Sequence, residues 1–411
     1  MYRLVKQNEI RDRALKERLE LVLPKVMEEC GVECWITACR EYNEDPLFDF
    51  ITPSLYPTAR RLTILLFYHR GEVSECISVS RPDPSLDQYY KRDYDVKKET
   101  QFEALTRVLY KLDPKNIAVN VSKDGFAFTD GLTHSLYETL KKELPAELCS
   151  RFISSDDVGI RLLETRTPSE LAYYPEVMSV ASEIIDKAFS DDVIVPGVTT
   201  CRDVMDFMEQ EVNDRGITVW FPATIDLQRH DGMHGEETVI ERGDLVHCDF
   251  GIFYLGLCTD TQRLCYILKE GENDAPKELY EALDRNHRFQ DIVRRNMALY
   301  LTGNETFDKS VKEGKELGLR PFLYSHPCGL YGHSAGPTIG LWDHQQGDIP
   351  HGERRLCEDT SYALELSILE YLEMYQRDTF IFTEETVVLH GGKAEFLDDL
   401  REKLFIAGGR P

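Results

Sequence analysis

Two apolar runs adjoin in the sequence as Gly243-Asp-Leu-Val-His-Cys-Asp-Phe-Gly251 and Ile252-Phe-Tyr-Leu-Gly-Leu-Cys-Thr-Asp260, and each carries an aspartate at or near its end. The glycines within them favour turns, so the pattern predicts one antiparallel hairpin that turns near residues 254 and 255. In that register Asp249 and Asp260 lie opposite each other on one face. Two opposed carboxylates repel, so the pair indicates a bound cation.

Two glutamates further along the chain have similar surroundings. Glu365 interrupts the strand-like run 362–368, and Glu384 interrupts the run 379–385. An acid inside an apolar strand is costly unless it is paired or binds a metal. Any one of these carboxylates alone is readily explained by an exposed edge strand, but all four together favour a shared acidic site.

A segment rich in histidine and glycine lies between these acids, Ser325-His-Pro-Cys-Gly-Leu-Tyr-Gly-His333-Ser-Ala-Gly-Pro337. Glycines allow the backbone to approach a ligand closely. Residues 332–336 also match the pattern GxSxG, which proposes a serine hydrolase with Ser334 as nucleophile. That motif requires a strand before it and a helix after it, and the flanking prolines and glycines disfavour both. The serine hydrolase is therefore kept only as a rival enzyme hypothesis.

Five residues occur in an order that resembles the metal-ligand set of the pita-bread metallopeptidases: Asp249, Asp260, His326, Glu365 and Glu384. This family includes methionine aminopeptidase, aminopeptidase P, prolidase and the non-peptidase creatinase. Residues 243–251, 258–263 and 383–387 resemble its metal-binding strands. His333, seven residues after His326, lies where the family has its second catalytic histidine.

The resemblance implies an α+β fold class. Residues 161–411 are expected to form the pita-bread catalytic domain, a curved antiparallel sheet with covering helices. Residues 1–160 are expected to form a creatinase-like α/β domain, and the family likeness also implies a homodimer. Sequence patterns predict strands at 61–68 and 116–121. They predict helices at 8–30 with a break at Pro24, at 101–112, from Thr167 with a kink or restart at Pro175, from Thr200 to Gly216, at 276–300, at 306–317 and near the C-terminus.

The implied ligand set suits two divalent metal ions. Four carboxylates and one neutral imidazole carry four negative charges, which two divalent cations balance. Oxygen-rich ligands favour Mn²⁺, with Co²⁺, Fe²⁺ or Zn²⁺ as alternatives. Such a pair of ions activates water for attack on a carbonyl. The resemblance then assigns Glu365 to proton transfer and His333 to substrate contact, and it places a further active-site histidine at His230 or His234, with His234 slightly favoured.

The implied activity is that of a metallopeptidase-like hydrolase, an aminopeptidase P or dipeptidase that cleaves small peptides near the N-terminus. Two alternatives remain: a creatinase-like hydrolase of a small amide or amidino metabolite, and a metal-free binding module. The chain departs from prolidase-like members at three positions, where Phe322 replaces a histidine, Phe382 an arginine and Leu366 a proline. These replacements predict a weakened preference for Xaa-Pro substrates and a more apolar pocket.

The composition of the 411-residue chain limits its partners. Lys and Arg number 48 against 73 Asp and Glu, a net charge of −25, which argues against nucleic acid or an anionic membrane surface as the main partner. No apolar run approaches the ~20 residues of a membrane span, and the charged N-terminus predicts no secretory signal. Eleven cysteines predict reduced thiols and a cytoplasmic location. The spacing of Cys30, Cys34 and Cys39 fits no zinc pattern, and Cys328 is expected to pack rather than react.

Overall fold

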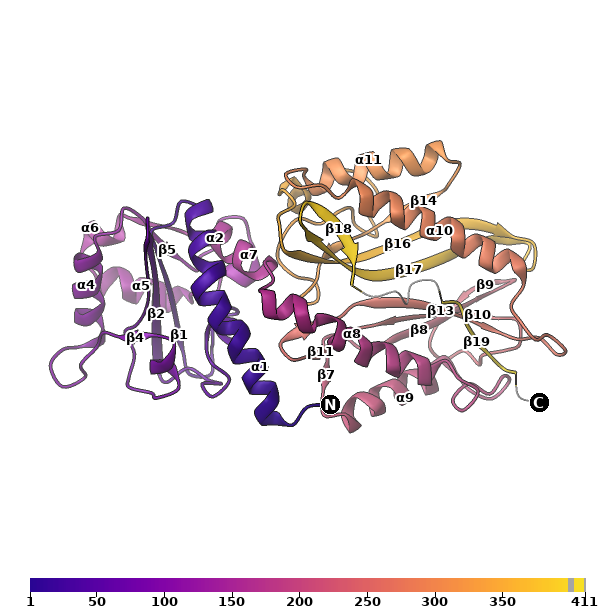
Figure 1. The fold of residues 1–411 in the computed structure, drawn as a ribbon, viewed down its shortest axis with the longest axis horizontal. Coiled ribbons are helices and arrows are strands. Elements are labelled where there is room, and N and C mark those ends of the chain that lie inside the picture. Colours follow the sequence, from indigo (N-terminus) through magenta and orange to yellow (C-terminus); the bar gives the residue numbers. More distant parts are fainter. Residues whose placement is uncertain (398–402, 410–411) are drawn as a thin grey trace. The chain divides into compact units, whose positions relative to one another are not determined.

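A computed structural model describes residues 1–397 and 403–409 of the chain (Figure 1). The chain folds into two compact units. One unit comprises Tyr2–Leu163 and Thr167–Ser169, and the other comprises Met1, Glu164–Arg166 and Glu170–Pro411. The separation of residues 1–160 and 161–411 as independent domains stays a prediction.

The N-terminal unit is built on a six-stranded mixed sheet. Its strands run in the order β4 (Lys91–Arg92), β3 (Val73–Ser78), β2 (Leu62–Arg70), β1 (Cys34–Arg40), β5 (Ile117–Val119) and β6 (Phe152–Ser154). Its helices are α1 (Leu4–Glu17), α2 (Leu23–Glu29), α3 (Phe48–Ile51), α4 (Gln101–Leu112), α5 (His134–Glu143), α6 (Ala146–Cys149) and α7 (Asp156–Glu164). Buried side chains of α4 and α5, among them Leu105 and Leu140, pack with Ile36 and Leu66 of the sheet. The expected α/β arrangement is confirmed.

The predicted break in the first helix occurs one turn earlier than Pro24. A π-helical turn, Arg18–Val22, separates α1 from α2, and Pro24 lies in the first turn of α2. Proline has no N–H to donate to the preceding turn, and it is tolerated where a helix begins. The irregular hydrogen bonding is therefore displaced into the residues before the proline.

The C-terminal unit is built on a ten-stranded sheet (Figure 1). Its main path is β14 (Pro321–Leu323), β16 (Thr360–Leu372), β17 (Arg377–His390), β13 (Thr261–Ile267), β10 (Leu245–Phe250), β8 (Thr224–Arg229) and β9 (Gly232–His234). Three short strands join it: β15 (His326–Pro327) on β16, β18 (Lys393–Phe396) on β17 and β19 (Phe405–Ala407) on β13. Only the β13–β19 pair is parallel among these described pairings. A separate three-stranded sheet contains β12 (Leu257–Cys258), β11 (Ile252–Tyr254) and β7 (Thr218–Val219).

Four long helices belong to this unit: α8 (Pro168–Ala188), α9 (Cys201–Asp214), α10 (Lys277–Asn296) and α11 (Gly303–Glu316). The helix α10 lies against β16 and β17, and α9 lies against β8. Leu283 and Phe289 of α10 are buried in the same core as Leu364 and Ile381 of the sheet. Helices packed on a largely antiparallel sheet confirm the expected α+β class.

The predicted helices of this unit differ from the structure in three details. Pro175 lies inside α8, which continues to Ala188 without restarting. The helix expected from residue 306 begins at Gly303, because Thr302 and Glu305 form a capping box that the prediction overlooked. Near the C-terminus the described residues form β18 and β19 instead of a helix, and residues 398–402 lie outside the described part.

None of the helices in the described residues combines the length and the apolar composition that crossing a lipid bilayer requires.

Candidate metal centre

The turn between the two aspartates is centred one residue later than predicted, so the residue opposite Asp249 changes by two positions. Asp249 lies opposite Gln262, and Tyr254 lies opposite Leu257. The turn is therefore centred on Leu255 and Gly256, both of which have positive φ, 54° and 85°. The predicted direct pairing of Asp249 with Asp260 is wrong. Asp260 lies two residues before Gln262, which returns it to the same side of the hairpin.

Four neighbouring strands instead contribute one polar residue each to a continuous row. Glu365 of β16 lies opposite Glu384 of β17, Glu384 lies opposite Gln262 of β13, and Gln262 lies opposite Asp249 of β10. Side chains at paired positions point to the same face of a sheet. The row therefore brings together three of the predicted metal ligands from segments that are up to 135 residues apart in sequence (384 − 249).

All five predicted ligands belong to groups whose ligand atoms lie within 4.8 Å of one another. Asp249, Asp260 and Glu384 form one group, and His326, Glu365 and Glu384 form another. Glu384 is common to both. Two adjoining sets that share one carboxylate are an arrangement suited to a pair of cations.

Several buried atoms of this site have no hydrogen-bond partner among the described residues: Asp249 Oδ1, Glu384 Oε1 and Oε2, and His326 Nε2. Buried polar atoms are normally satisfied, and an unpaired buried charge is costly. Burial, followed by repulsion from neighbouring carboxylates, raises the pKa of Glu365 to about 8. The same two causes raise the pKa of Asp260 and of Glu384 well above the ordinary range. Burial raises the pKa of Asp249 to about 6. Cations would satisfy these atoms, so the residues present fit a divalent metal pair.

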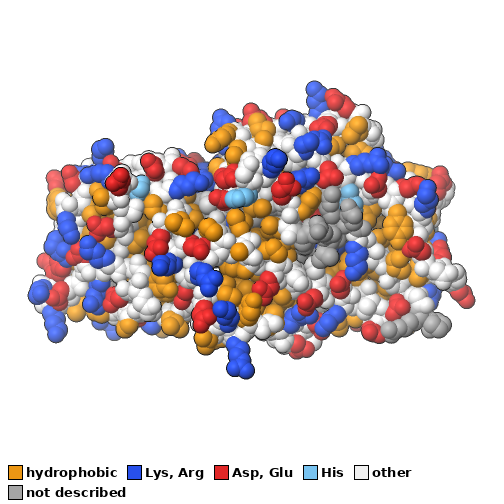
Figure 2. Space-filling model, viewed as in Figure 1, with side chains coloured by type: hydrophobic (Ala, Val, Ile, Leu, Met, Phe, Trp, Pro, Cys, Tyr) orange, Lys and Arg blue, Asp and Glu red, His pale blue; other side chains and the backbone are white. Residues whose placement is uncertain are grey.

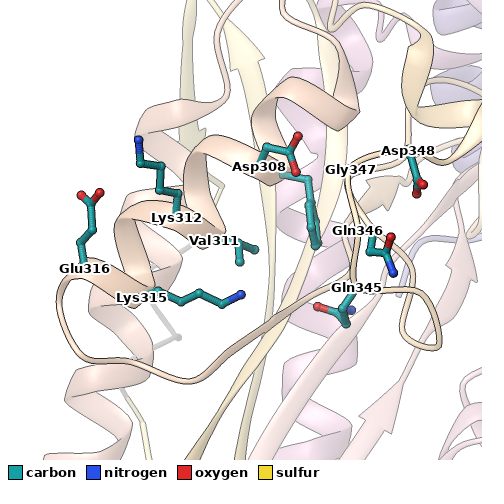
Figure 3. A pocket seen from close by; sticks show the side chains of 10 residues that line it. Asp308, Val311, Lys312, Lys315, Glu316, Gln345, Gln346, Gly347 and Asp348 are labelled. Atoms are coloured by element: carbon teal, nitrogen blue, oxygen red, sulfur yellow. The ribbon is translucent and has the colours of Figure 1, made fainter.

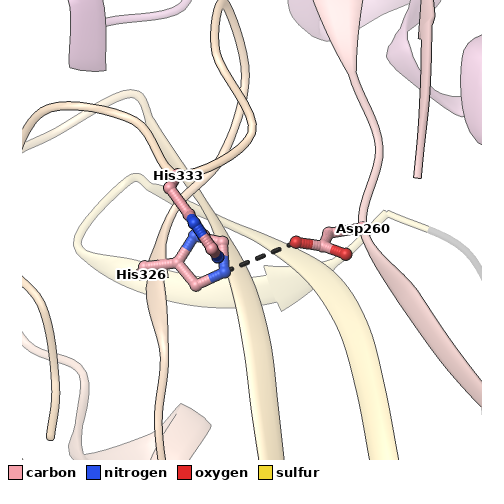
Figure 4. Close-up of side chains that lie close together, drawn as sticks. All are labelled: Asp260, His326 and His333. Carbon is pink, nitrogen blue, oxygen red and sulfur yellow. Dashed lines mark ion pairs between the residues drawn. The ribbon is translucent and has the colours of Figure 1, made fainter. Parts of the chain in front are cut away.

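The orientation of His326 leaves one ring nitrogen free for a cation. Nδ1 lies 3.1 Å from the carbonyl oxygen of Pro327, which can only accept, so Nδ1 carries the proton. Nε2 then has a lone pair, and it lies 3.4 Å from Asp260 Oδ2 (Figure 4). Burial, with a contribution from His333, lowers the pKa of His326 to about 3, so the ring is neutral near pH 7. A neutral imidazole with a fixed tautomer is the form that binds metal.

His333 lies beside His326, as the sequence prediction requires. The two ring centroids are 4.5 Å apart at an interplanar angle of 85° (Figure 4). Ligand atoms of His333, His326 and Asp260 also form a group within 4.8 Å. The residue is solvent-accessible, and the partial burial of its ring lowers the pKa of His333. Proximity alone does not separate substrate contact from metal binding, so the role of His333 stays a prediction.

Trp220 supports the histidine loop and was missed in the sequence. Its ring lies 5.0 Å from that of His333, and its Nε1 donates to the carbonyl oxygen of Thr259 at 2.8 Å. A Cβ atom placed on Gly332 would lie 2.2 Å from the Trp220 ring. Close approach to this ring therefore explains Gly332. The available signal was that Trp220 is one of three tryptophans in the chain.

A buried hydrogen-bonded chain behind Glu365 was also missed. Gln262 donates through Nε2 to Glu365 Oε1 at 2.8 Å, and its Oε1 lies 3.1 Å from His247 Nε2. Nδ1 of His247 lies 3.1 Å from Asp226 Oδ2. Each ring nitrogen of His247 therefore lies within hydrogen-bond distance of a side-chain oxygen. Burial lowers the pKa of His247, but the Asp226 and Asp249 carboxylates and the contact with Gln262 together outweigh burial, and the net direction is upward.

The two upstream histidines lie at one edge of the sheet. His230 is exposed in the turn between β8 and β9. His234 is half-buried in β9, and its Nε2 lies 2.7 Å from Asp231 Oδ1. Neither belongs to a candidate metal group of the described residues. Their proposed catalytic role stays a prediction.

The rival nucleophiles lack the surroundings that they need. Ser334 Oγ has no hydrogen-bond partner within the described chain, and residues 337–349, directly after the segment 332–336, contain no helix. The serine-hydrolase hypothesis is therefore without a base and without its motif context. Cys328 is 2% exposed, and burial raises the pKa of its thiol well above the ordinary value. Buried thiols were expected at Cys30, Cys34 and Cys39; Cys34 and Cys39 are buried, whereas Cys30 is half-buried.

Other charged features lie away from this centre. Glu358, Asp359 and His390 form a more open group, and Asp359 Oδ1 already lies 2.6 Å from His390 Nδ1. A cavity of about 690 Å³ lies between α11 and residues 345–348, with Lys312 and Lys315 on its helical side (Figure 3). None of the predicted site residues lines it. On the face shown in Figure 2, acidic and basic side chains are interspersed over the part drawn in colour.

Comparison with known proteins finds relatives of this chain. The sequence pattern of a family described as metallopeptidase family M24 matches residues 174–390. A putative Xaa-Pro aminopeptidase of Mycoplasma pneumoniae is 24% identical over 227 residues, which are 54% of this chain and 60% of that protein. The similarity thus spans less than two thirds of that relative.

Solved structures resemble the chain over nearly its full length. The X-Pro aminopeptidase of Thermotoga maritima MSB8 has a TM-score of 0.65 at 20% identity, covering 93% of this chain and 99% of that one. The Xaa-Pro dipeptidase of Bacillus anthracis has a TM-score of 0.62 at 19% identity, covering 95% and 99%. A variant of Escherichia coli aminopeptidase P has a TM-score of 0.57 at 16% identity, covering 95% and 94%. At these identities the likeness concerns the fold, and the expected pita-bread fold is confirmed.

Proposed function

This chain belongs to metallopeptidase family M24, and on that basis we propose that it is a dinuclear metal-dependent hydrolase that cleaves small peptides near the N-terminus, in the manner of an aminopeptidase P or dipeptidase. The observation that supports this most is the convergence of four carboxylates, two of them buried and two half-buried, and one neutral imidazole. Among their atoms, Asp249 Oδ1, both carboxylate oxygens of Glu384 and His326 Nε2 are buried without a hydrogen-bond partner in the described residues. A metal-free binding module has no use for such a costly cluster.

The proposed metal ligands are the five predicted from sequence: Asp249, Asp260, His326, Glu365 and Glu384. Their mostly oxygen-donor character favours Mn²⁺, with Co²⁺, Fe²⁺ and Zn²⁺ as alternatives. When bound, two divalent cations supply an activated water and polarise the substrate carbonyl. The ligand carboxylates would fix the position of the cations, because β-strand register holds Asp249, Glu384 and Glu365 in one row.

The remaining side chains supply protons and orientation. Glu365 is the proposed carrier of a proton to the leaving nitrogen, and Gln262 holds one of its oxygens in place at 2.8 Å. His333 is the proposed donor of a hydrogen bond to a substrate oxygen on which negative charge develops. Trp220 packs against His333 and limits where its ring can lie. His234, or His230, is retained as a further active-site histidine.

The biological setting belongs to the same proposal. A cytoplasmic location is supported by eleven cysteines that all remain free thiols. A homodimer is supported by the family resemblance. The net charge of −25 supports a small peptide, rather than a nucleic acid, as the partner.

Metal analysis followed by a substrate panel tests this proposal. We expect about two divalent ions per chain, loss of peptide cleavage after chelation and recovery with Mn²⁺ or Co²⁺. Dipeptides and tripeptides form one panel, and small amides and amidino compounds form a second, with products identified by mass spectrometry. Full turnover after exhaustive chelation would reject the proposal, and cleavage confined to the second panel would favour the creatinase-like alternative.

A further inference from the structure

An apolar pocket of about 370 Å³ opens beside the metal-ligand row. Its walls include Phe322, Phe380 and Phe382, and Glu365 is the single charged side chain among the described residues that line it. Met233 and Trp342 also line it, and they are 46% and 75% exposed. Large apolar side chains left accessible around a concavity are typical of a binding site.

Strand register explains why the pocket lies next to the catalytic carboxylates. Phe322 of β14 lies opposite Ser367 of β16, and Ser367 lies opposite Phe382 of β17. These residues form a row two positions from Glu365 and Glu384, on the same face of the sheet. Two residues along a strand span about 6.6–6.8 Å. A substrate whose scissile carbonyl lies at the carboxylate row would therefore place an adjoining side chain over the phenylalanine row.

The phenylalanines form a continuous aromatic wall. The ring centroids of Phe322 and Phe380 are 5.3 Å apart, and those of Phe380 and Phe382 are 5.5 Å apart with an interplanar angle of 22°. Phe382 in turn lies 4.5 Å from His247, whose ring is fixed by Asp226 and Gln262. The aromatic wall thus contacts His247, which belongs to the same buried series of hydrogen bonds that holds Glu365.

Apart from the Glu365 carboxylate and the Tyr324 hydroxyl, the polar groups of the pocket offer little to a charged or strongly polar side chain. Gln345 is occupied, because its amide bonds the backbone N–H and carbonyl of Leu323 and the carbonyl of Leu341. Ser367 is 5% exposed. No lysine or arginine lines the pocket within the described residues, so an acidic side chain would have no partner there.

We propose that this pocket binds a bulky apolar side chain, aromatic or branched aliphatic, of a residue that adjoins the scissile bond. The proposal rests on the peptidase function proposed above and names the substrate class of the same site. An engineered apolar cavity of about 150 Å³ binds benzene, so this volume accommodates a phenyl or isobutyl group. Burying such a group contributes about 1.5–3 kcal/mol, or roughly 10- to 150-fold in affinity.

Binding measured without turnover tests the pocket directly. The probes are the amides of L-phenylalanine, L-leucine, L-alanine and L-lysine, titrated into Mn²⁺-loaded protein by calorimetry. We expect the phenylalanine and leucine amides to bind at least 10-fold more tightly than the alanine and lysine amides. Equal affinity for all four amides overturns the proposal, whatever the protein cleaves.

Substitutions of the phenylalanines in the aromatic wall test whether the preference for apolar amides comes from this pocket. Phe382→Ala should reduce the preference for the phenylalanine amide over the alanine amide by roughly 10-fold or more, and Phe322→Leu should reduce it less. Phe396→Ala is the matched control, because Phe396 is a half-buried phenylalanine of β18 that does not line the pocket. Circular dichroism and metal content verify that each variant is folded. A preference that survives Phe382→Ala in folded protein contradicts the proposal.

Measurements of peptide cleavage distinguish the pocket proposal from the peptidase function on which it rests. Tripeptides that vary one residue at a time should show kcat/KM values higher for Phe or Leu than for Ala, Asp or Lys at one position next to the cleaved bond. Metal-dependent cleavage without that preference supports the peptidase function and rejects the pocket assignment. Absence of any cleavage, together with selective binding of the apolar amides, rejects the peptidase function and retains the pocket.

Discussion

His326 shows how a single backbone contact selects the chemistry of a side chain. Its Nδ1 is committed to the carbonyl oxygen of Pro327, so the free lone pair lies on Nε2. The ring of His333 lies only 4.5 Å away between centroids, but His333 is solvent-accessible where His326 is buried. Two histidines that look alike in sequence therefore differ in exposure and in what fixes their rings.

We predict that His326→Ala loses metal and activity together, because it removes a ligand atom from the buried centre. His333→Ala should retain metal and lower kcat by roughly 10²–10⁴-fold, the range of general acid–base or oxyanion contacts. Metal content by elemental analysis and turnover are measured on the same samples. Equal metal loss in both variants, or full activity of His333→Ala, would overturn the assignment.

A second prediction concerns the carboxylates. Asp249→Asn and Glu384→Gln should each lower metal occupancy, because each removes a charge that helps to hold the cations. The effect of Glu384→Gln should be larger, since Glu384 belongs to both ligand groups. Glu358→Gln, in the more open group near His390, is the control and should leave occupancy unchanged. Retention of two metals in Glu384→Gln would show that its ligand role is wrong.

At the scale of elements, the pairing of β16 with β17 brings the candidate metal ligands close to residues of the apolar pocket. Glu365 pairs with Glu384, and two positions along the same strands Ser367 pairs with Phe382. A slip of one residue would turn both sets to the other face of the sheet. The long pairing of β16 with β17, from Thr360 with Leu389 to Leu372 with Arg377, fixes this register.

The loop that carries His333 provides the prediction at this scale. In Gly332→Ala the new methyl group would collide with the Trp220 ring, so the loop must shift and displace His333. We expect kcat to fall by roughly 10–10²-fold, as for a catalytic group misplaced by about 1 Å, while metal content remains.

Two companion variants interpret that result. Gly235→Ala is the steric control, because a Cβ at Gly235 would meet no atom within 4 Å. Trp220→Leu combined with Gly332→Ala removes the collision but also the support of His333, so it should not restore full turnover. Wild-type turnover in Gly332→Ala would show that the Trp220 contact does not position the loop.

At the scale of the whole molecule, the raised carboxyl pKa values of the candidate metal centre make the free energy of unfolding depend on pH and on bound metal. The pKa of Glu365 is raised to about 8 from 4.5, and that of Asp249 to about 6 from 3.8. A raised carboxyl pKa means that the folded state retains a proton that the unfolded state releases. The contribution of these two groups to the free energy of unfolding is fully present below about pH 4. It is lost as the pH rises through about 6 for Asp249 and about 8 for Glu365.

We therefore predict that the melting temperature of chelated protein falls between pH 5 and pH 8, whereas Mn²⁺-loaded protein changes much less. Each kcal/mol of lost stability lowers the melting temperature by about 2–4 °C for a unit of this size. Differential scanning calorimetry of both forms across this range measures the effect. A chelated protein that becomes more stable as pH rises would contradict the raised pKa values.

Local sequence patterns were sufficient for many of the elements and for proposing a set of candidate ligands. Residues 101–112 form the predicted helix, and capping chemistry at Thr200 placed α9 correctly. The five candidate ligands came from the order of acids and histidines, which resembles the ligand order of a known metallopeptidase family.

Long-range packing decided the rest. The turn at Leu255 and Gly256 set the hairpin register, and this turn differs by one residue from the one that alternation predicts. The chain from Asp226 through His247 and Gln262 appears only when β8, β10 and β13 are paired. The pocket likewise needs Phe322 and Phe382, 60 residues apart (382 − 322), in one row. Sequence periodicity defines which face a residue occupies within its strand, but only the paired strands determine its neighbours, because register is a property of the sheet.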